Sequence, residues 1–369
     1  MNVATRLPWW LPRVGSEERE RVLDVLDSNF LNDGAVTDEF ERRLAALVGC
    51  SHVVTVTSGT MALYAALAAL GIGASDEVLV PDVTFIATAN AVTLAGATPV
   101  LVDVDPRTLN MDAASAARAI TPRTRAIMPV HVSGRAVDLR HIMALANEHA
   151  LHVVEDAAEA FMSKWHGRSL GTFGVAGCVS FSPNKTIMTG QGGAVFTNDE
   201  GLASRLRELK DQGRARRGTG GDDLHPVVGF NLKFTNLQAA VGLGQLSQLD
   251  WRLARLKRIY TLYRDGLRDL PQVNLPGFDL DAGESPQWID AVVELRDELD
   301  RYLGERGMEC RRFWFPLHRQ APYRSAAAAF PNSTSVVPRA LWLPSAFTLT
   351  DADVESVCEA IHAFYLHEA

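Results

Sequence analysis

The stretch that decides the fold runs from residue 52 to residue 70 and reads HVVTVTSGTMALYAALAAL. Four of its first five residues are β-branched, which predicts a buried strand at residues 52–56. The Ser-Gly-Thr turn that follows is typical of a helix start, and the alanine- and leucine-rich run at 61–70 predicts the helix itself. We therefore expect a strand that turns sharply into a helix, as in an α/β fold.

The alternation of strand-like and helix-like runs continues to about residue 197. Further apolar runs predict strands at residues 77–80, 99–104, 125–130, 151–155, 177–181 and 193–197. Residues 87–95 and 139–149 predict helices between them. Because strands and helices alternate, we expect a mostly parallel sheet with right-handed crossovers.

The rest of the chain predicts a second, smaller unit. Helices are expected at residues 16–28 and, as one long element, at 236–267. Pro271, Pro276 and Pro286 then punctuate the sequence. We expect an α/β fold in which residues 1–250 form an N-terminal segment and a large sheet domain, and residues 251–369 form a smaller C-terminal α/β domain.

Composition excludes several classes of protein. The formal net charge of −8 argues against a nucleic-acid binder that relies on bulk charge, and no apolar run is long enough to span a membrane. The N-terminus lacks the pattern of a signal peptide. The four cysteines are widely spaced, so neither a metal site nor a disulfide framework is expected. These features favour a cytoplasmic protein.

The segment 180–186, SFSPNKT, is the first candidate for chemistry. Ser180 precedes Lys185 by five residues, and the glycine-rich segment 190–193, GQGG, follows. A lysine amine can condense with the aldehyde of pyridoxal phosphate (PLP), while a serine hydroxyl holds its phosphate. A lone lysine in a loop is more often a solvated surface residue, so this segment needs support from the rest of the chain.

Two other strand ends supply that support. At 57–60, TSGT, the free N–H groups of a helix start and a glycine predict a phosphate cradle, although a plain helix cap explains the same residues. At 154–160, VEDAAEA, Asp156 follows a strand and can pair with a protonated pyridine nitrogen. A helix cap is the alternative for Asp156 as well.

Two weaker candidates lie in loops. Phe85 follows the strand at 77–80 and can stack on a cofactor ring, although a lone Phe is more often a core residue. Arg214, Arg216 and Arg217 precede a glycine-rich turn, and guanidinium groups bind diphosphates well. A solvated charged surface is the competing interpretation of the arginines.

Taken together, these segments resemble the sugar aminotransferases of PLP fold type I, the DegT/DnrJ/StrS group. The resemblance covers nearly the whole chain. The matching segments are 57–60 (TSGT), 81–90 (PDVTFIATAN), 121–131 (TPRTRAIMPVH), 154–160 (VEDAAEA), 171–174 (GTFG), 180–193 (SFSPNKTIMTGQGG), 229–240 (GFNLKFTNLQAA) and 316–318 (PLH).

The resemblance implies a role for each matched residue. Lys185 would bind PLP covalently as an internal aldimine and later move protons, with pyridoxamine phosphate as the intermediate. Asp156 would pair with the pyridine nitrogen and Phe85 would cover one face of the ring. The phosphate ligands would be Gly59, Thr60 and Ser180, joined by Asn231 from the neighbouring subunit of a homodimer. His318 would contact the substrate.

Two residues depart from the group's usual pattern. Glu159 stands where many members have glutamine, near the cofactor's phenolic oxygen, and an ionised carboxylate there would be repelled. A glutamate in this place is found in perosamine-type 4-aminotransferases, which this chain also resembles around Lys185. Lys233 stands where arginine is usual, and we expect a structural role for it.

The resemblance implies an aminotransferase that moves the amino group of L-glutamate to a nucleotide-linked keto sugar, with a GDP-linked 4-keto-6-deoxy sugar as the first candidate. A PLP-dependent sugar dehydratase is the nearest alternative, but those members carry histidine in place of Lys185. A PLP-binding regulator would need a DNA-binding module, for which the pattern leaves no room. A nicotinamide-dependent enzyme would need a GxGxxG segment after the first strand, which is absent.

Overall fold

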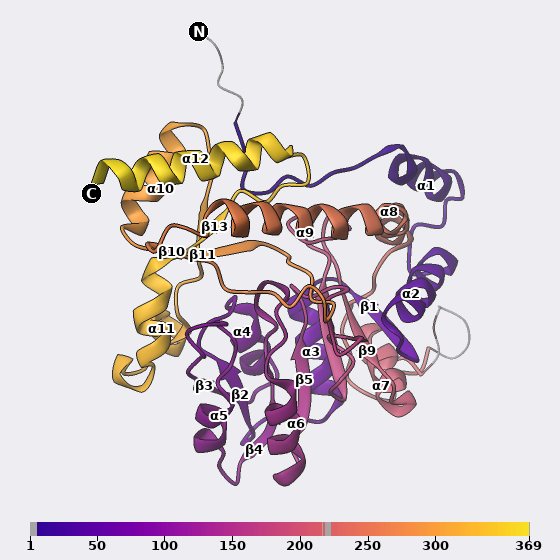
Figure 1. Ribbon diagram of the computed structural model, residues 1–369. Helices are drawn as coiled ribbons and strands as arrows, with labels where there is room; N and C mark the ends of the chain where they lie inside the picture. The colour runs from indigo at the N-terminus through magenta and orange to yellow at the C-terminus, as the bar shows by residue number, and fades with distance from the viewer. Residues whose placement is uncertain (1–5, 216, 218–222, 369) are drawn as a thin grey trace.

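The computed structural model describes residues 6–215, 217 and 223–368, and contains two principal sheets (Figure 1). The strands of the larger sheet lie in the order β1-β9-β8-β5-β4-β2-β3. They are β1 (His52–Val56), β2 (Glu77–Pro81), β3 (Thr98–Val102), β4 (Thr124–Ile127), β5 (His152–Asp156), β8 (Ala176–Ser180) and β9 (Gly193–Thr197). A hairpin of β6 (Lys164–Trp165) and β7 (Arg168–Ser169) stands apart.

The larger sheet is parallel except at one strand, which confirms the predicted α/β class. β9 runs antiparallel to both of its neighbours, β8 and β1, so all the other strands point in one direction. The predicted strand at 125–130 ends earlier, at Ile127, because Pro129 has no N–H to donate to a ladder. The carboxyl ends of β1, β2, β5 and β8 therefore meet at one edge.

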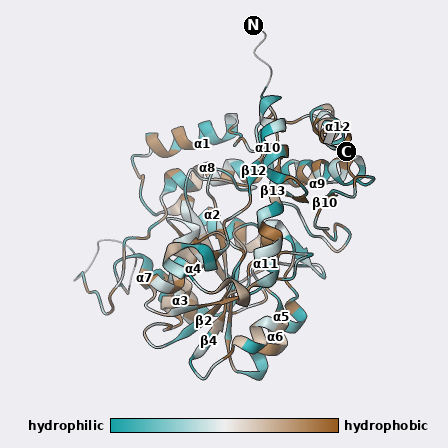
Figure 2. Ribbon diagram, turned by 90° about the vertical axis from the view of Figure 1, so that its left-hand side faces the viewer, coloured by the Kyte–Doolittle hydropathy of each residue, from teal (hydrophilic) through white to brown (hydrophobic). Residues whose placement is uncertain are grey.

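Helices cover both faces of this sheet. The helices of the N-terminal two thirds are α1 (Ser16–Asp27), α2 (Ala35–Val48), α3 (Gly59–Ala69), α4 (Ala87–Leu94), α5 (Ala113–Ala119), α6 (Leu139–Glu148), α7 (Glu200–Lys210) and α8 (Asn236–Ser247). Successive strand residues point to opposite faces, so Val53 belongs to the core cluster that includes residues of α2 and α6, while Val54 belongs to the cluster that includes residues of α3 and α4. α3 is hydrophobic on all sides, as its colour in Figure 2 shows, because it is buried between the sheet and its neighbours.

The smaller sheet has the order β10-β11-β13-β12 and is antiparallel. Its strands are β10 (Val273–Asn274), β11 (Ile289–Val293), β12 (Arg311–Arg312) and β13 (Ala340–Leu343). The helices that accompany it are α9 (Leu249–Gly266), α10 (Arg296–Glu305), α11 (Pro331–Val336) and α12 (Asp351–Glu368). Figure 1 shows α9 and α12 lying along one another above the larger sheet.

The single long helix expected at 236–267 is wrong, because the chain breaks at Gln248. α8 ends at Ser247 and α9 begins at Leu249, with Gln248 at φ −108° and ψ 12°. The two helices pack on different partners: α8 lies against α1 and α2, and α9 lies against α12. Burial of apolar residues on separate partners overrides the helical propensity of the joining residues.

The segment that precedes α1 lies beside the smaller sheet. Leu7 exchanges backbone hydrogen bonds with Gly307 and Glu309, and Trp9 accepts one from Ser345 at 2.9 Å. The division at residues 250 and 251 remains our proposal for the domain boundary. Within the described ranges, no helix combines the length and apolar character needed to cross a membrane.

Candidate active site

The carboxyl edge of the larger sheet brings distant segments together. β1 leads to Ser58 and Gly59, β5 ends at Asp156 and β8 ends at Ser180. The loop between β8 and β9 carries Lys185 back over the same edge. Open α/β sheets place ligands at this edge, and here a cavity of about 390 Å³ opens there.

Most of the sequence-predicted residues line this cavity. Those that do are Gly59, Thr60, Phe85, Asp156, Glu159, Ser180 and Lys185. Those that do not, within the described part of this one chain, are Asn231, Arg214, Arg217 and His318. Trp288, Trp314 and Arg311 complete the lining from the smaller sheet's side and were not anticipated from the sequence.

The amine of Lys185 is largely buried and is not a solvated surface group. Its side chain is 10% exposed, and Nζ lies 3.4 Å from Glu159 Oε1 and 4.5 Å from the centre of the Trp288 ring. Burial lowers the pKa of Lys185, while the carboxylates of Glu159 and Asp156 oppose that shift. The alternative of a surface lysine does not describe this residue.

Asp156 is held at the base of the cavity. Its Oδ2 accepts a hydrogen bond from Thr88 Oγ1 at 2.8 Å, and its Oδ1 accepts one from Ala158 N at 3.1 Å. Burial raises the pKa of Asp156, and these hydrogen bonds together with the nearby Lys185 act in the other direction. A cation placed against this carboxyl would favour its ionised form.

Glu159 faces Lys185 and is held from behind by a strained turn. Glu159 Oε2 accepts a hydrogen bond from Ser133 N at 3.0 Å. Ser133 has φ 53°, and its hydroxyl donates to Asp290 Oδ1 at 2.7 Å. Burial raises the pKa of Glu159 to about 7. The carboxyl is therefore fixed in position, and burial favours its protonated form.

Small residues form a cradle where β1 and β8 end, in the wall of the same cavity. A Cβ on Gly59 would lie 2.8 Å from Ser180 Cβ, and one on Gly193 would lie 2.5 Å from the backbone carbon of Ser58. Ser58 caps α3 by accepting from Met61 N at 3.2 Å. The earlier N–H groups of the helix have no acceptor within it, so they face the cavity as donors for an anion.

Phe85 stands at the mouth of the cavity, with 53% of its surface exposed. Because it is so exposed, the alternative of a core residue does not apply. Its face is available to stack on a flat ligand.

His318 instead lies in the packing between the two sheets. It is 1% exposed, its Nδ1 lies 2.6 Å from Asp82 Oδ2, and its ring stacks on Phe330 at 4.9 Å. Asp82 also accepts from the backbone N–H of His318 and from the hydroxyl of Ser333. The residue ties the smaller sheet's segment to the end of β2, and it does not reach the cavity of this chain.

The described arginines of the predicted loop form ion pairs with acidic residues of the same chain. Arg217 pairs with Asp33 and Asp38, at 2.6 and 2.5 Å. Arg214 pairs with Asp223 at 2.8 Å. Arg216 lies outside the described residues.

Asn231 and Lys233 flank the same region. Asn231 is exposed, and its backbone forms a bridge with Asp211. Lys233 Nζ lies 2.8 Å from Asp211 Oδ1, an ion pair that gives it the structural role we expected.

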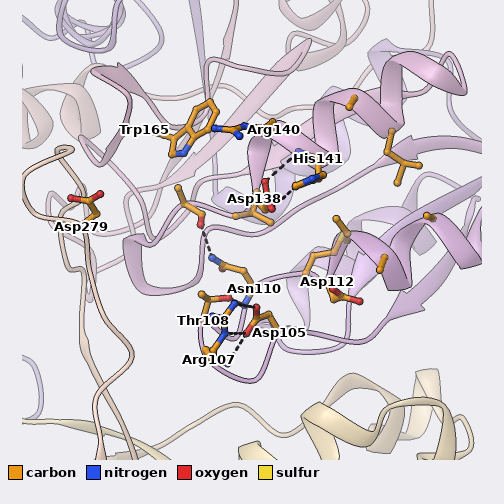
Figure 3. Close-up of a pocket in the computed structure, with 18 of the residues that line it drawn as sticks. Asp105, Arg107, Thr108, Asn110, Asp112, Asp138, Arg140, His141, Trp165 and Asp279 are labelled. Atoms are coloured by element: carbon orange, nitrogen blue, oxygen red, sulfur yellow. Dashed lines mark hydrogen bonds and ion pairs between the residues drawn. The ribbon is translucent and has the colours of Figure 1, made fainter.

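A larger groove of about 890 Å³ lies elsewhere, between α5, α6 and the loop that holds Asp279 (Figure 3). Two pairs of its charged side chains lie in contact with each other. Arg107 pairs with Asp105 and His141 with Asp138, as the dashed lines show. Lys185 and Asp156 do not line it, so the smaller cavity is the candidate active site.

The sequence placed Glu155 beside Asp156 at the end of a strand but gave it no role of its own, and the structure shows that it organises the neighbouring loop. This fully buried carboxylate accepts from the backbone N–H groups of Gly171, Phe173 and Gly174. It also lies 3.0 Å from His131 Nε2. Its place beside Asp156 was the available signal, but two adjacent strand residues point to opposite faces, and only Asp156 faces the cavity.

Comparisons with known proteins agree with this geometry. The chain is 40% identical over 371 residues to a GDP-perosamine synthase of Caulobacter vibrioides, covering 98% of this chain and 99% of the relative. It is 34% identical to a dTDP-4-dehydro-2,3,6-trideoxy-D-glucose 4-aminotransferase of Saccharopolyspora spinosa, covering 94% of each. The crystal structure of S. venezuelae DesV in complex with a ketimine intermediate matches with a TM-score of 0.89 and 35% identity, covering 95% of this chain and 94% of DesV.

The model of the DegT/DnrJ/EryC1/StrS aminotransferase family matches residues 12–362. Because that match spans almost the entire chain and the relatives cover it equally, the protein belongs to the DegT/DnrJ/EryC1/StrS aminotransferase family.

Proposed function

We propose that this aminotransferase moves the amino group of L-glutamate to a nucleotide-linked keto sugar, with a GDP-linked 4-keto-6-deoxy sugar as the first candidate. The observation that carries the proposal is the placement of Lys185, Asp156 and the Gly59–Ser180 cradle around one cavity. The names of the full-length relatives, a GDP-perosamine synthase and a sugar 4-aminotransferase, support the class of acceptor.

Membership of this family implies dependence on PLP, and the residues present fit that cofactor. The cradle is closed to any Cβ at Gly59, and hydroxyl and N–H donors surround it, as a phosphate requires. In our proposal Gly59, Thr60 and Ser180 would hold the phosphate, and Lys185 would bind the cofactor covalently.

The other cavity residues would fix the ring. Asp156, which is buried and lines the same cavity, would pair with the pyridine nitrogen. Phe85 would cover one face of the ring, and Glu159 would lie near the phenolic oxygen. When bound, PLP supplies an electron sink that stabilises negative charge at the carbon that loses a proton.

Lys185 and Glu159 would carry out the proton transfers. An amine whose pKa is lowered by burial is more often neutral, and a neutral amine can accept a proton from a substrate carbon and return it. Glu159, with a pKa of about 7, can stay protonated beside an oxygen anion and thereby avoid the repulsion expected of a carboxylate.

We propose a cytoplasmic homodimer with shared active sites, in which Asn231 contacts the phosphate bound by the neighbouring subunit. The exposure of Asn231 away from its own cavity supports this arrangement. The arginine loop remains our candidate for the substrate diphosphate. Arg214 and Arg217 would have to exchange acid partners for that diphosphate.

A panel of nucleotide sugars tests the proposed function. Purified enzyme and L-glutamate would be incubated with nucleotide-linked 4-keto and 3-keto sugars carrying GDP, UDP or dTDP, and the products read by mass spectrometry. We expect an amino sugar from at least one 4-keto substrate. Loss of water without gain of nitrogen would instead identify the sugar dehydratase that we placed second.

A further inference from the structure

Arg311 is a positively charged residue of the cavity lining to which the proposed function assigns no role. It lies on the short edge strand β12 and lines the cavity beside Trp314. Its guanidinium carbon stands 4.7 Å from the centre of the Trp9 ring and 5.4 Å from that of Trp342. Trp342 is also its cross-strand partner on β13, so the stacking follows from the register.

This stacking leaves the hydrogen-bonding edge of Arg311 unused. In the described part of the chain, Arg311 makes neither an ion pair nor a side-chain hydrogen bond, whereas the next residue does. Arg312 is the next residue of the strand, so its side chain points to the opposite face of the sheet. It pairs with Asp297 and Asp300, at 3.3 and 3.1 Å. A guanidinium that stacks against two aromatic rings and keeps its donors free is prepared for a planar anion such as a carboxylate.

The charges that line the cavity indicate which anion Arg311 binds. Among the described residues that line the cavity, the cationic side chains are Lys185 and Arg311, and the anionic ones are Asp156 and Glu159. An amino acid brings at least one carboxylate into this cavity. Lys185 is already committed to the reacting amine, so Arg311 is the cation left to offset the repulsion by the two acids.

We propose that Arg311 binds a carboxylate of the amino donor. This inference rests on the proposed function and adds to it the residue that recognises L-glutamate. A carboxylate is favoured over a diphosphate because the α-carboxylate of an amino acid is bonded to the carbon that bears the amine. It must therefore enter the same cavity as Lys185, whereas the diphosphate of a 4-keto sugar is separated from the reacting carbon by the sugar ring.

Kinetics of Arg311→Gln and Arg311→Lys, with Arg312→Gln as the matched control, test the proposal. Loss of a charge-assisted contact should raise the KM for L-glutamate roughly tenfold or more in Arg311→Gln. The KM for the nucleotide sugar should stay within about twofold, since that substrate does not use the contact. Arg311→Lys should recover part of the loss, and Arg312→Gln should match the wild type.

A binding measurement separates this inference from the proposed function. Glutarate, which is glutamate without the amine, would be titrated into the purified wild-type and variant proteins by calorimetry. The proposal expects weaker binding in Arg311→Gln and unchanged binding in Arg312→Gln. It is overturned if glutarate binds both variants equally, if only the nucleotide-sugar KM rises, or if Arg311→Gln lowers the melting temperature and both KM values change together. Failure of the wild type to aminate any sugar would instead count against the proposed function alone.

Discussion

Lys185 Nζ and Glu159 Oε1 lie 3.4 Å apart, and both side chains are about nine-tenths withdrawn from solvent. Burial moves the two groups in opposite directions, because it lowers the pKa of the amine and raises the pKa of the carboxyl to about 7. The charged and neutral forms of the pair are therefore closer in free energy than they would be in water. This arrangement is the one that our proposal of proton transfer by Lys185 and Glu159 requires.

Replacement of Lys185 by Ala should remove both the covalently bound cofactor and all transamination, because no other lysine lines the cavity among the described residues. The check is the visible absorption of the purified protein, followed by borohydride reduction and peptide mass spectrometry. Lys164→Ala, on the separate β6–β7 hairpin, is the control and should retain both. An active Lys185→Ala enzyme would falsify the assignment of this residue.

Asp156→Asn should lower kcat by roughly 10²–10³-fold, the range seen when one preorganised electrostatic contact is removed from an active site. The fold should persist, because an amide oxygen can still accept from Thr88 Oγ1 or Ala158 N. Steady-state kinetics and circular dichroism give the two readings. Asp138→Asn, in the other groove, provides the comparison and should have near-normal turnover. Equal, small effects of the two substitutions would reduce Asp156 to a structural residue.

Glu159→Gln should change how stability depends on pH. The pKa of this carboxyl is raised from its ordinary value of 4.5 in the unfolded chain to about 7 in the folded one, so the folded state holds more protons between these values. Stability of the wild type should therefore fall as pH rises through this window, and Glu159→Gln should lack that part of the loss. Melting temperatures at pH 5 and pH 8, at matched cofactor loading, measure it. Parallel shifts of the two proteins would contradict the raised pKa.

Subunit exchange tests the position of Asn231. If Asn231 acts across a dimer, mixing Asn231→Ala with Lys185→Ala chains produces one site that has both native residues. If both residues act within one chain, no site in the mixed dimer is intact. Activity that appears only after exchange, with both pure variants impaired, is the expected result. An active monomer by light scattering would rule out a shared site.

The larger sheet was predictable because its strands are short, nearly continuous apolar runs that are rich in β-branched residues and bounded by turn residues. Those features separate such strands from buried helices, which periodicity alone does not. Lys185, Asp156 and Gly59 were predictable for a related reason, since parallel strands deliver their following residues to one edge. The α8–α9 break was not, because the residues around Gln248 favour a helix and only packing on different partners separates the two.

The residues that the smaller sheet contributes to the site could not be predicted from the local sequence around them. Arg311 and Trp288 are far from Lys185 in sequence, and β12 has only two residues, too few for an alternation pattern. The prediction that His318 contacts the substrate failed for a related reason. In the sequence, a histidine that pairs with a buried carboxylate cannot be distinguished from one that binds substrate, and only the structure shows Asp82 beside it.

The most direct test of the central claim follows nitrogen from donor to acceptor. Enzyme carrying its cofactor would be incubated with heavy-nitrogen-labelled L-glutamate and a GDP-linked 4-keto-6-deoxy sugar, and the nucleotide sugar isolated for mass spectrometry. Our account predicts that the heavy nitrogen appears in the sugar, with 2-oxoglutarate formed in equal amount, and that Lys185→Ala transfers none. Unlabelled sugar across the whole panel of keto-sugar nucleotides, from an enzyme that binds PLP at Lys185, would contradict it.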